Sequence, residues 1–245
     1  MLQRSVLIAL ATCLWLTTLL LHTACAEPIE LEGLLEPSES IDVSSQIPGV
    51  IDQISVERGD FVKKGQLLVT LKSGVEAAAV DLAEAKVEFG ERKAARNVEL
   101  HLKKLISSHE KDEIETELKV ARLELREAKE RLEMRRIYST VDGIIVQRQL
   151  GSGEYVGENP IFSIASVNPL FVEVIAPVAY VGKIRTRMKA IVIPEEPVGG
   201  HYSAKVTVVD PVIDAASGTF GVRLELSNNK GQLPAGLKCR VRFGD

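Results

Sequence analysis

The segments 49–62 and 143–156 of this chain repeat one another at a constant offset of 94 residues, the step from Gly49 to Gly143. They read GVIDQISVERGDFV and GIIVQRQLGSGEYV and align without a gap. A central glycine in each copy, Gly59 or Gly153, supplies the positive φ that a tight turn between two short strands requires. One copy alone is too small to bury its apolar face. We therefore expect the two copies to pack on one another as a single quasi-symmetric β-sandwich.

The residues between the two copies have the pattern of a helical hairpin over 74–138. Ser73-Gly74-Val75-Glu76 and Ser107-Ser108-His109-Glu110 are typical of capping boxes, in which a serine hydroxyl and a glutamate carboxylate satisfy free amides at a helix start. They predict helices over 75–106 and 108–137. At 1.5 Å per residue, two antiparallel helices of this length make a rod ~45 Å long that projects from the sandwich.

Apolar residues on both predicted helices indicate how they contact one another. In the second helix they recur at the strict 4-3 spacing of a coiled-coil seam, at Ile114, Leu118, Ala121, Leu125, Ala128 and Leu132. In the first helix the spacing is less regular and changes phase near Gly90. We assign its seam to two groups of residues, Leu82, Ala85 and Phe89 before the change, and Ala95, Val98, Leu102 and Leu105 after it.

The two copies of the repeat resemble the halves of the biotinyl/lipoyl domain family. GVIDQISVERGDFVKKGQLLVTL is similar to the first half and DGIIVQRQLGSGEYVGENPIFSI to the second. In carrier domains of that family a tight hairpin with an exposed lysine joins the halves, and here the helical segment stands in its place. Lys63 and Lys64 lie inside the first half, so the resemblance implies no lysine for a prosthetic group and no cofactor. A carrier protein of a multi-enzyme complex is the weaker alternative.

A split lipoyl-like domain with a projecting hairpin resembles the periplasmic adaptor subunits, or membrane fusion proteins, of resistance-nodulation-division (RND) tripartite efflux pumps, the HlyD-like family. The predicted hairpin tip carries Arg96, Leu100 and Ser107 at the spacing of the tip motif of adaptors that engage TolC-type channels, with Asp112 nearby. The resemblance implies that Arg96 hydrogen-bonds to the channel, Leu100 enters an apolar groove and Ser107 bonds to channel groups. On the residues alone, Arg96 could be a solvated side chain, Leu100 a seam residue and Ser107 a helix cap.

From residue 168 onward the chain reads as short strands separated by turn signals, at 171–175, 189–193, 203–209, 220–226 and 238–243. This part resembles the adaptor β-barrel, with 29–35 as its first strand and 178–184 as a short capping helix. The loop before 189 lacks the glycine usual in the family, which puts its geometry in doubt. Since the chain stops at Asp245 without the usual membrane-proximal domain, we expect docking to a transporter mainly through the barrel and the lipoyl-like domain, or through another subunit.

The predicted fold class is α+β, elongated and multidomain: a split lipoyl-like β-sandwich with an inserted antiparallel α-helical hairpin, plus a β-barrel domain. The expected domains are a signal peptide at 1–26, the barrel at 27–47 and 168–245, the lipoyl-like domain at 48–73 and 139–167, and the hairpin at 74–138.

The first 26 residues have the pattern of an export signal. Arg4 precedes an apolar run over 6–21, and Ala24-Cys25-Ala26 follows as a small-x-small cleavage site, so we expect the mature protein to begin at Glu27 in the periplasm, without lipid. A retained membrane anchor is disfavoured because the run is shorter than the ~20 residues of a spanning helix. Lipidation of Cys25 is the other alternative, weakened because His22 stands where a lipobox has a Leu-like residue.

Charge and motif content exclude several classes of function. The formal net charge is −4, which disfavours nucleic acid as a partner. The sequence has no nucleophile elbow, P-loop or dinucleotide-binding motif, and His101 and His109 lack the accompanying ligands of a metal site, so we expect neither an enzyme nor a metal protein.

The expected function is that of an adaptor linking an inner-membrane RND transporter to a TolC-type outer-membrane channel, for the export of drugs or other toxic compounds. The adaptor is expected to form a homo-oligomeric ring, a trimer or hexamer, in the assembled pump and to be associated with the inner membrane through it. Alternatives are an adaptor of an ABC exporter, as in type I secretion or macrolide export, and a structural coiled-coil protein of the envelope.

Overall fold

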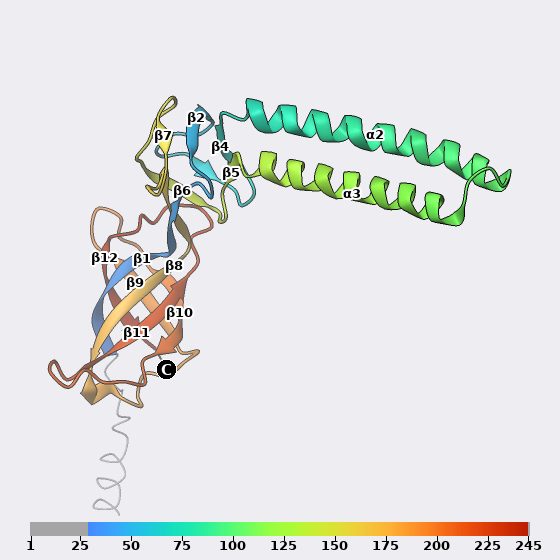
Figure 1. Cartoon of the computed structure of the whole chain (residues 1–245). Helices are drawn as coiled ribbons and strands as arrows, with labels where there is room; N and C mark the ends of the chain where they lie inside the picture. The colour runs from blue at the N-terminus through green and yellow to red at the C-terminus, as the bar shows by residue number, and fades with distance from the viewer. Residues whose placement is uncertain (1–28, 245) are drawn as a thin grey trace, which may run out of the picture.

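The computed structural model describes residues 29–244, which form a β-barrel, a β-sandwich and a long pair of helices (Figure 1). The expected signal peptide, including Cys25 and the cleavage point, lies outside the described residues. The fold is mostly β with two helices, and the predicted barrel and sandwich are both present. In the part of the chain that the structure describes, neither helix is long and apolar enough to cross a membrane.

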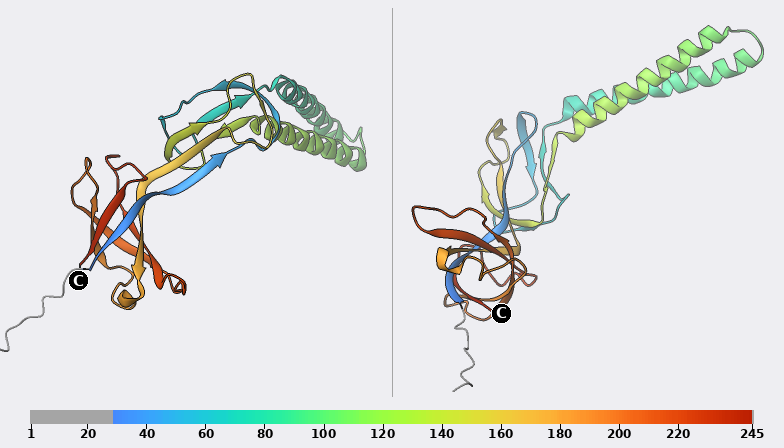
Figure 2. Two further views of the ribbon diagram at one scale, coloured as in Figure 1. Left: turned by 90° about the vertical axis from the view of Figure 1, so that its left-hand side faces the viewer. Right: turned by 90° about the horizontal axis from the view of Figure 1, so that it is seen from below.

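The barrel closes through six strands in the order β1, β12, β9, β10, β11, β8 and back to β1 (Figure 2). Side chains in β11 alternate between the interior and solvent, because successive residues of a strand point to opposite faces. The predicted barrel strands are present: β9 to β12 differ from the prediction by at most one residue at an end, whereas β1 and β8 are much longer than predicted because both continue into the sandwich. Their bounds are β1 Ile29–Val43, β8 Phe162–Pro177, β9 Lys189–Pro194, β10 Tyr202–Val209, β11 Thr219–Leu226 and β12 Lys238–Phe243.

The sandwich joins the two copies of the repeat, as predicted. One layer is a sheet with the strand order β5-β4-β2-β7. In the other layer, β6 pairs with the part of β8 that lies in the sandwich, next to β1, and β3 pairs with β6. Its aliphatic core holds Ile51 and the equivalent Ile145, both fully buried. The bounds of these short strands are β2 Gly49–Ile54, β3 Phe61–Val62, β4 Leu67–Leu71, β5 Arg136–Tyr138, β6 Gly143–Arg148 and β7 Tyr155–Val156.

Backbone hydrogen bonds in the sandwich follow the sequence repeat. The amide of Gly59 donates to the carbonyl of Ile145 at 2.8 Å, and the equivalent Gly153 donates to Ile51 at 2.8 Å. Ile145 and Ile51 donate back to the residue after each glycine, at 3.0 and 2.9 Å. Both glycines have the positive φ expected of them, 95° and 86°. Each turn is therefore held by the strand of the other copy, and neither half closes alone.

Two strands run through both domains. β1 and β8 pair antiparallel from Gly33 and Val174 in the barrel to Val43 and Phe162 in the sandwich, with one register shift between Pro37 and Glu39. The left view of Figure 2 shows this ribbon passing from one domain into the other. Within β1, Leu35 packs in the barrel core and Val43 in the sandwich core. The predicted domain boundaries stay a prediction.

The helices α2 (Gly74–Leu102) and α3 (Ser108–Glu133) run side by side in opposite directions away from the sandwich (Figure 1). The ion pairs Lys86–Glu124 at 2.9 Å and Lys93–Glu117 at 2.5 Å bridge them. The apolar residues predicted for the seam of the second helix are all half-buried in α3, where Lys111 is the one other half-buried residue, and this confirms the 4-3 pattern.

The predicted seam of the first helix is wrong. Its large members are exposed, with Leu82 at 63% and Phe89 at 58% of their surface, and Val98, Leu102 and Leu105 are exposed as well. The residues that face α3 are smaller, because the two helices approach closely, and a Cβ added at Gly90 would meet Leu118 at 3.2 Å. These inner residues recur at 3-4 spacing and are Val80, Ala83, Val87, Gly90, Ala94, Asn97 and His101.

The helix ends also differ from the expectation. The Ser73 side chain makes no capping hydrogen bond, so the first predicted capping box is wrong. The glutamate meant to complete it, Glu76, bonds instead to Arg135. α2 ends at Leu102, before a turn in which Lys104 has a φ of 58°. α3 ends at Glu133, because the following residues join the sandwich as β5.

The loop that leads to β9 resolves the doubt raised by its missing glycine. Arg187 adopts the left-handed conformation, with a φ of 70°, and its amide donates to the carbonyl of Val206 at 2.8 Å. An arginine thus takes the backbone conformation for which glycine is the ordinary choice. The short helix expected at 178–184 is a single 3₁₀ turn, η1, over Val178–Tyr180.

The repeat offers a matched test of packing in the sandwich. A Cβ at Gly143 would stand 2.6 Å from the backbone carbonyl oxygen of Ala165, whereas a Cβ at the equivalent Gly49 would meet the movable end of Arg135. We expect Gly143→Ala to lower the free energy of unfolding by about 1–3 kcal/mol, because backbone cannot yield. Gly49→Ala should cost less. Urea denaturation of both variants measures the difference, and an equal or reversed loss contradicts this account.

Candidate functional site

The most remote surface of the molecule is the tip of the helix pair, defined here as residues 96–112 (Figure 1). The chain reverses direction within a few residues after α2 ends. The amide of Leu105 donates to the carbonyl of Leu100 at 2.9 Å, and Lys103 pairs with Glu99 at 2.6 Å. The tip is therefore an ordered turn closed by its own hydrogen bonds.

Ser107 starts α3 with the predicted capping box. Its hydroxyl accepts a hydrogen bond from the amide of Glu110 at 3.1 Å, and the Glu110 carboxylate accepts one from the amide of Ser107 at 3.2 Å. Both amides would otherwise lack partners at the helix start. Ser107 remains exposed, so its capping role leaves it on the surface of the tip.

Arg96 and Leu100 lie one helical turn apart on α2 and share a face, because residues four apart are neighbours on a helix. Arg96 is exposed and Leu100 is half-buried beside the inner seam, which passes through Asn97 and His101. Arg96 and Leu100 are thus brought together, while Ser107 lies beyond the turn. Whether the three bind a partner stays a prediction.

Two apolar residues at the tip were missed as site candidates by the sequence analysis, which placed them in the seam. Leu102 is 77% exposed and Leu105 is 67% exposed, and they flank the turn. The signal that could have found them is the 3-4 spacing that starts at Val80 and ends at His101. Any leucine beyond that point lies outside the contact between the helices.

The tip does not have the chemistry of a metal site. Within residues 29–244, no group of three or more His, Cys, Asp or Glu side chains is placed to hold a metal ion. His101 lies in the inner seam, where its Nδ1 atom is buried without a hydrogen-bond partner. The surface of the tip offers exposed leucines and hydrogen-bonding groups.

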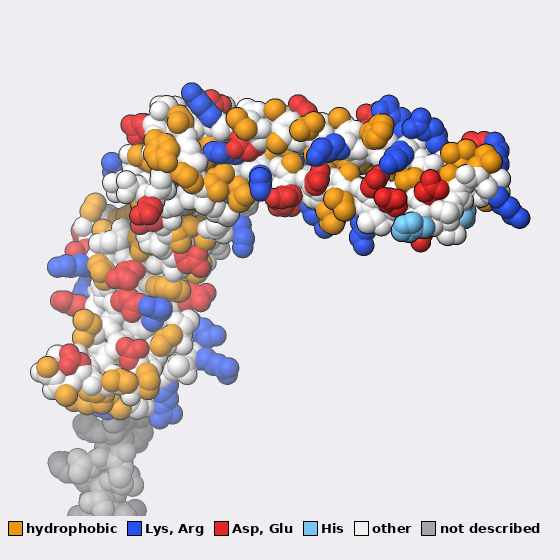
Figure 3. Space-filling model, in the orientation of Figure 1, with side chains coloured by type: hydrophobic (Ala, Val, Ile, Leu, Met, Phe, Trp, Pro, Cys, Tyr) orange, Lys and Arg blue, Asp and Glu red, His pale blue; other side chains and the backbone are white. Residues whose placement is uncertain are grey.

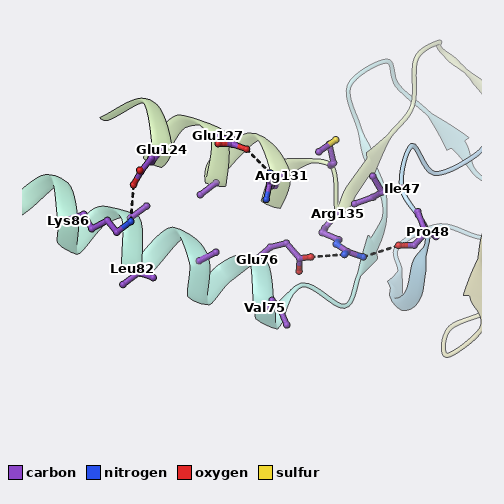
Figure 4. Close-up of a pocket in the computed structure, with 14 residues that line it drawn as sticks. Ile47, Pro48, Val75, Glu76, Leu82, Lys86, Glu124, Glu127, Arg131 and Arg135 are labelled. Carbon is purple, nitrogen blue, oxygen red and sulfur yellow. Dashed lines mark hydrogen bonds and ion pairs between the residues drawn. The ribbon is translucent and has the colours of Figure 1, made fainter. Parts of the chain in front are cut away.

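A cleft of about 570 Å³ lies at the other end of the helix pair, where it meets the sandwich (Figure 4). Val75 and Leu82 of α2 line one side, and the loop residues Ile47 and Pro48 line another. Arg135 closes its base: its guanidinium donates to Glu76 at 2.6 Å and to the carbonyl of Pro48 at 3.2 Å. This bridge ties both helices to the sandwich.

The bridge affects the acidity of Glu76. Hydrogen bonding from its own backbone amide, followed by the Arg135 guanidinium, holds the pKa of Glu76 below its usual value of 4.5, against the opposing effect of burial. A lowered carboxyl pKa means that the folded state favours the ionised form.

Comparison with known proteins follows the division into two β-domains. Residues 39–166 match the family model described as a CzcB-like barrel-sandwich hybrid domain, and residues 169–245 match that of a CusB-like beta-barrel domain. The chain is 26% identical over 243 residues to the membrane fusion protein MtrC of Neisseria gonorrhoeae, and 24% identical over 227 residues to the nodulation protein NolF of Rhizobium meliloti. These alignments cover 87% and 86% of this chain but only 59% and 62% of the relatives.

Among solved structures, the fold is similar to that of a MacA-MexA chimeric protein that contains the Pseudomonas aeruginosa MexA alpha-hairpin domain. The TM-score is 0.75 at 19% identity, and the match covers 88% of this chain and 80% of the chimera. At this identity the likeness concerns the fold alone.

The cap at Ser107 can be tested locally. Ser107→Ala removes the acceptor for the Glu110 amide, so we expect the first turn of α3 to lose about 1 kcal/mol of stability. Hydrogen exchange of the amides at 108–112 should accelerate, while exchange in the barrel stays unchanged. Ser108→Ala is the matched control. Unchanged exchange in Ser107→Ala contradicts the capping role.

The Glu76 bridge predicts a pH dependence. At pH 7, Glu76→Gln should lower the melting temperature, because the wild-type carboxylate is stabilised by the fold. This advantage is present above the unfolded-state pKa and is lost as the pH falls through the lower folded-state pKa. The two melting temperatures should therefore converge at acidic pH. A difference that stays constant down to the lowest pH at which the protein remains folded shows that charge on Glu76 is not the cause.

Proposed function

The chain belongs to the membrane fusion protein family, and we propose that it is a periplasmic adaptor linking an inner-membrane RND transporter to a TolC-type outer-membrane channel. The observation that carries this proposal is the split sandwich, which sends a helix pair away from the barrel and presents an exposed apolar tip at its end. An adaptor of this kind performs no chemistry, and it acts by holding two membrane proteins in register. Its cargo is a drug or another toxic compound.

In this proposal the tip contacts the channel. Leu100 enters an apolar groove between channel helices, Arg96 donates hydrogen bonds across the contact, and Ser107 bonds to channel groups beside its own capping bond. Leu100 is half-buried, so neighbouring side chains restrict its conformation before it binds, which supports this role. Leu102 and Leu105 enlarge the apolar surface around it.

The other end of the molecule contacts the transporter in this proposal. The barrel and the sandwich form a homo-oligomeric ring, a trimer or hexamer, on the transporter, and the helix pairs gather into a tube above it. This places the protein in the periplasm, associated with the inner membrane through the pump. The helix pair is stiffened by ion pairs along its length, which suits a spacer.

The tip assignment predicts loss of channel binding without loss of fold. Leu100→Asp puts a charge into an apolar contact, which typically costs ~2 kcal/mol or more and weakens docking by tens of fold. Arg96→Ala and Ser107→Ala should weaken docking less. Val98→Asp, an exposed change on the same helix outside the motif, is the control. Crosslinking to the channel in cells, paired with melting temperature, gives the readout. If Leu100→Asp keeps both its melting temperature and its crosslinking to the channel, the tip does not bind the channel.

The transporter class needs its own measurement. Crosslinking of intact cells followed by identification of the captured inner-membrane protein should yield an RND transporter. Capture of a transporter with an ATP-binding cassette assigns the chain to an ABC exporter instead. The tip prediction holds in either case, because it concerns only the channel end.

A further inference from the structure

Several large apolar side chains of the helix pair point away from the contact between the helices. On α2, Val75, Leu82 and Phe89 recur every seven residues and are 81%, 63% and 58% exposed. On α3, Val120 and Leu123 are 49% and 50% exposed. We call these sets the outer stripe of α2 and the outer stripe of α3. A seven-residue apolar repeat on an exposed helix face is the pattern of a second helix contact.

The two outer stripes overlap in height along the helix pair. The ion pair Lys86–Glu124 shows that these two residues lie at the same level along the helix pair. Because the helices are antiparallel, a step of one residue toward the tip raises the residue number by one on α2 and lowers it by one on α3. Phe89, three residues beyond Lys86, is therefore level with residue 121. Val120 and Leu123 lie within two residues of that level, or about 3 Å. Copies related by a ring axis keep the same height, so this register brings Phe89 opposite the outer stripe of α3 in a neighbour.

Charge is complementary nearer the tip. Arg96 lies three residues beyond Lys93, whose partner is Glu117, so Arg96 is level with residue 114. Glu113 is the adjacent acidic residue, and both side chains are exposed. Seven residues separate Arg96 from Phe89, and seven separate Glu113 from Val120, so each charge continues the outer stripe of its helix. An ion pair between copies here fixes the same register as the apolar contact, and it leaves other N–H donors of the Arg96 guanidinium free for the channel.

The outer stripes also lean toward one face of the helix pair. Leu82 lines the basal cleft together with Lys86 and Glu124, and Val120 lines a second hollow with the same two charged residues. In Figure 3, apolar side chains recur among the charged ones along this part of the molecule. Because both outer stripes lean toward the same face of the helix pair, each copy bound through them is rotated relative to the previous copy in the same direction. Different surfaces that meet head to tail close into a ring when that turn is regular.

We propose that the outer stripe of α2 binds the outer stripe of α3 in the next copy of this chain, with Phe89 seated between Val120 and Leu123. This inference rests on the proposed function, which supplies the parallel copies, and it adds the surface through which they touch. The contact is heterologous, so every copy uses both stripes and a row of copies continues until it closes.

Disulfide crosslinking in the cell envelope tests the contact in the full chain. The double variant Phe89→Cys with Leu123→Cys should give a ladder of covalent multimers on oxidation. Either single variant should give none, because a head-to-tail contact brings together two different residues. Cys239 does not interfere, since it is 2% exposed and burial raises its pKa to about 11, while the reactive form is the thiolate.

The matched control lies on the opposite face of the helix pair. Glu88 stands between Glu84 and Glu91, which pair with Lys129 and Arg122, and Arg126 stands between these two partners. Glu88→Cys with Arg126→Cys should give no ladder.

Each outcome of the crosslinking decides the proposal. Dimers from Phe89→Cys alone show a two-fold contact and overturn it, as do a ladder from the control pair, no ladder from the test pair, or capture of a different protein only. The channel contact is read separately in the same cells. Adding Leu100→Asp should remove channel crosslinks and keep the ladder. Loss of the ladder with intact channel crosslinks refutes the stripes and leaves the adaptor function standing.

Discussion

The reciprocal hydrogen bonds between the two copies of the repeat are the constraint on which the rest of the molecule depends. Because Gly59 bonds to Ile145 and Gly153 to Ile51, the sandwich forms only when segments far apart in sequence meet. Everything inserted between the copies must leave and return at the same place. The amide of Leu71 bonds to the carbonyl of Arg135 at 2.8 Å, which fastens the start and the end of the helix pair side by side. The pair can therefore be long without a separate anchor.

The sandwich and the seam of α3 were predictable from sequence, and the seam of α2 was not, for a physical reason. In α3 the inner stripe is long and regular and holds most of the large apolar side chains, whereas the outer one has only Val120 and Leu123, so the period identifies the buried face. In α2 two stripes are apolar, and the larger side chains, such as Leu82 and Phe89, occupy the outer one. Close approach to α3 selects small residues such as Ala83 and Gly90 for the inner stripe. In α2 the larger and more hydrophobic residues lie on the outer face, while the face that contacts α3 carries small residues. A prediction based on hydrophobicity alone therefore selects the outer face, which is wrong.

The tip likewise has residues that could be predicted from sequence and residues that could not. Ser107 could be predicted because a cap depends on residues within one turn, and its partner Glu110 is three positions away. Leu102 and Leu105 could not, since their exposure depends on where α2 ends and on the left-handed turn at Lys104. The same limit explains the failed cap at Ser73, where Glu76 is taken by Arg135, a residue 59 positions away. Local rules hold until a distant partner competes.

The strands β1 and β8 make the barrel and the sandwich share one ribbon in place of a flexible linker. Their interstrand hydrogen bonds lie across the strand direction. A force that pulls the two domains apart along this ribbon is carried by the covalent backbones of both strands, because each strand is built into both domains. The register shift between Pro37 and Glu39 interrupts the ladder where the domains meet, so bending is easiest there. The molecule therefore resists stretching between the two domains more strongly than it resists bending.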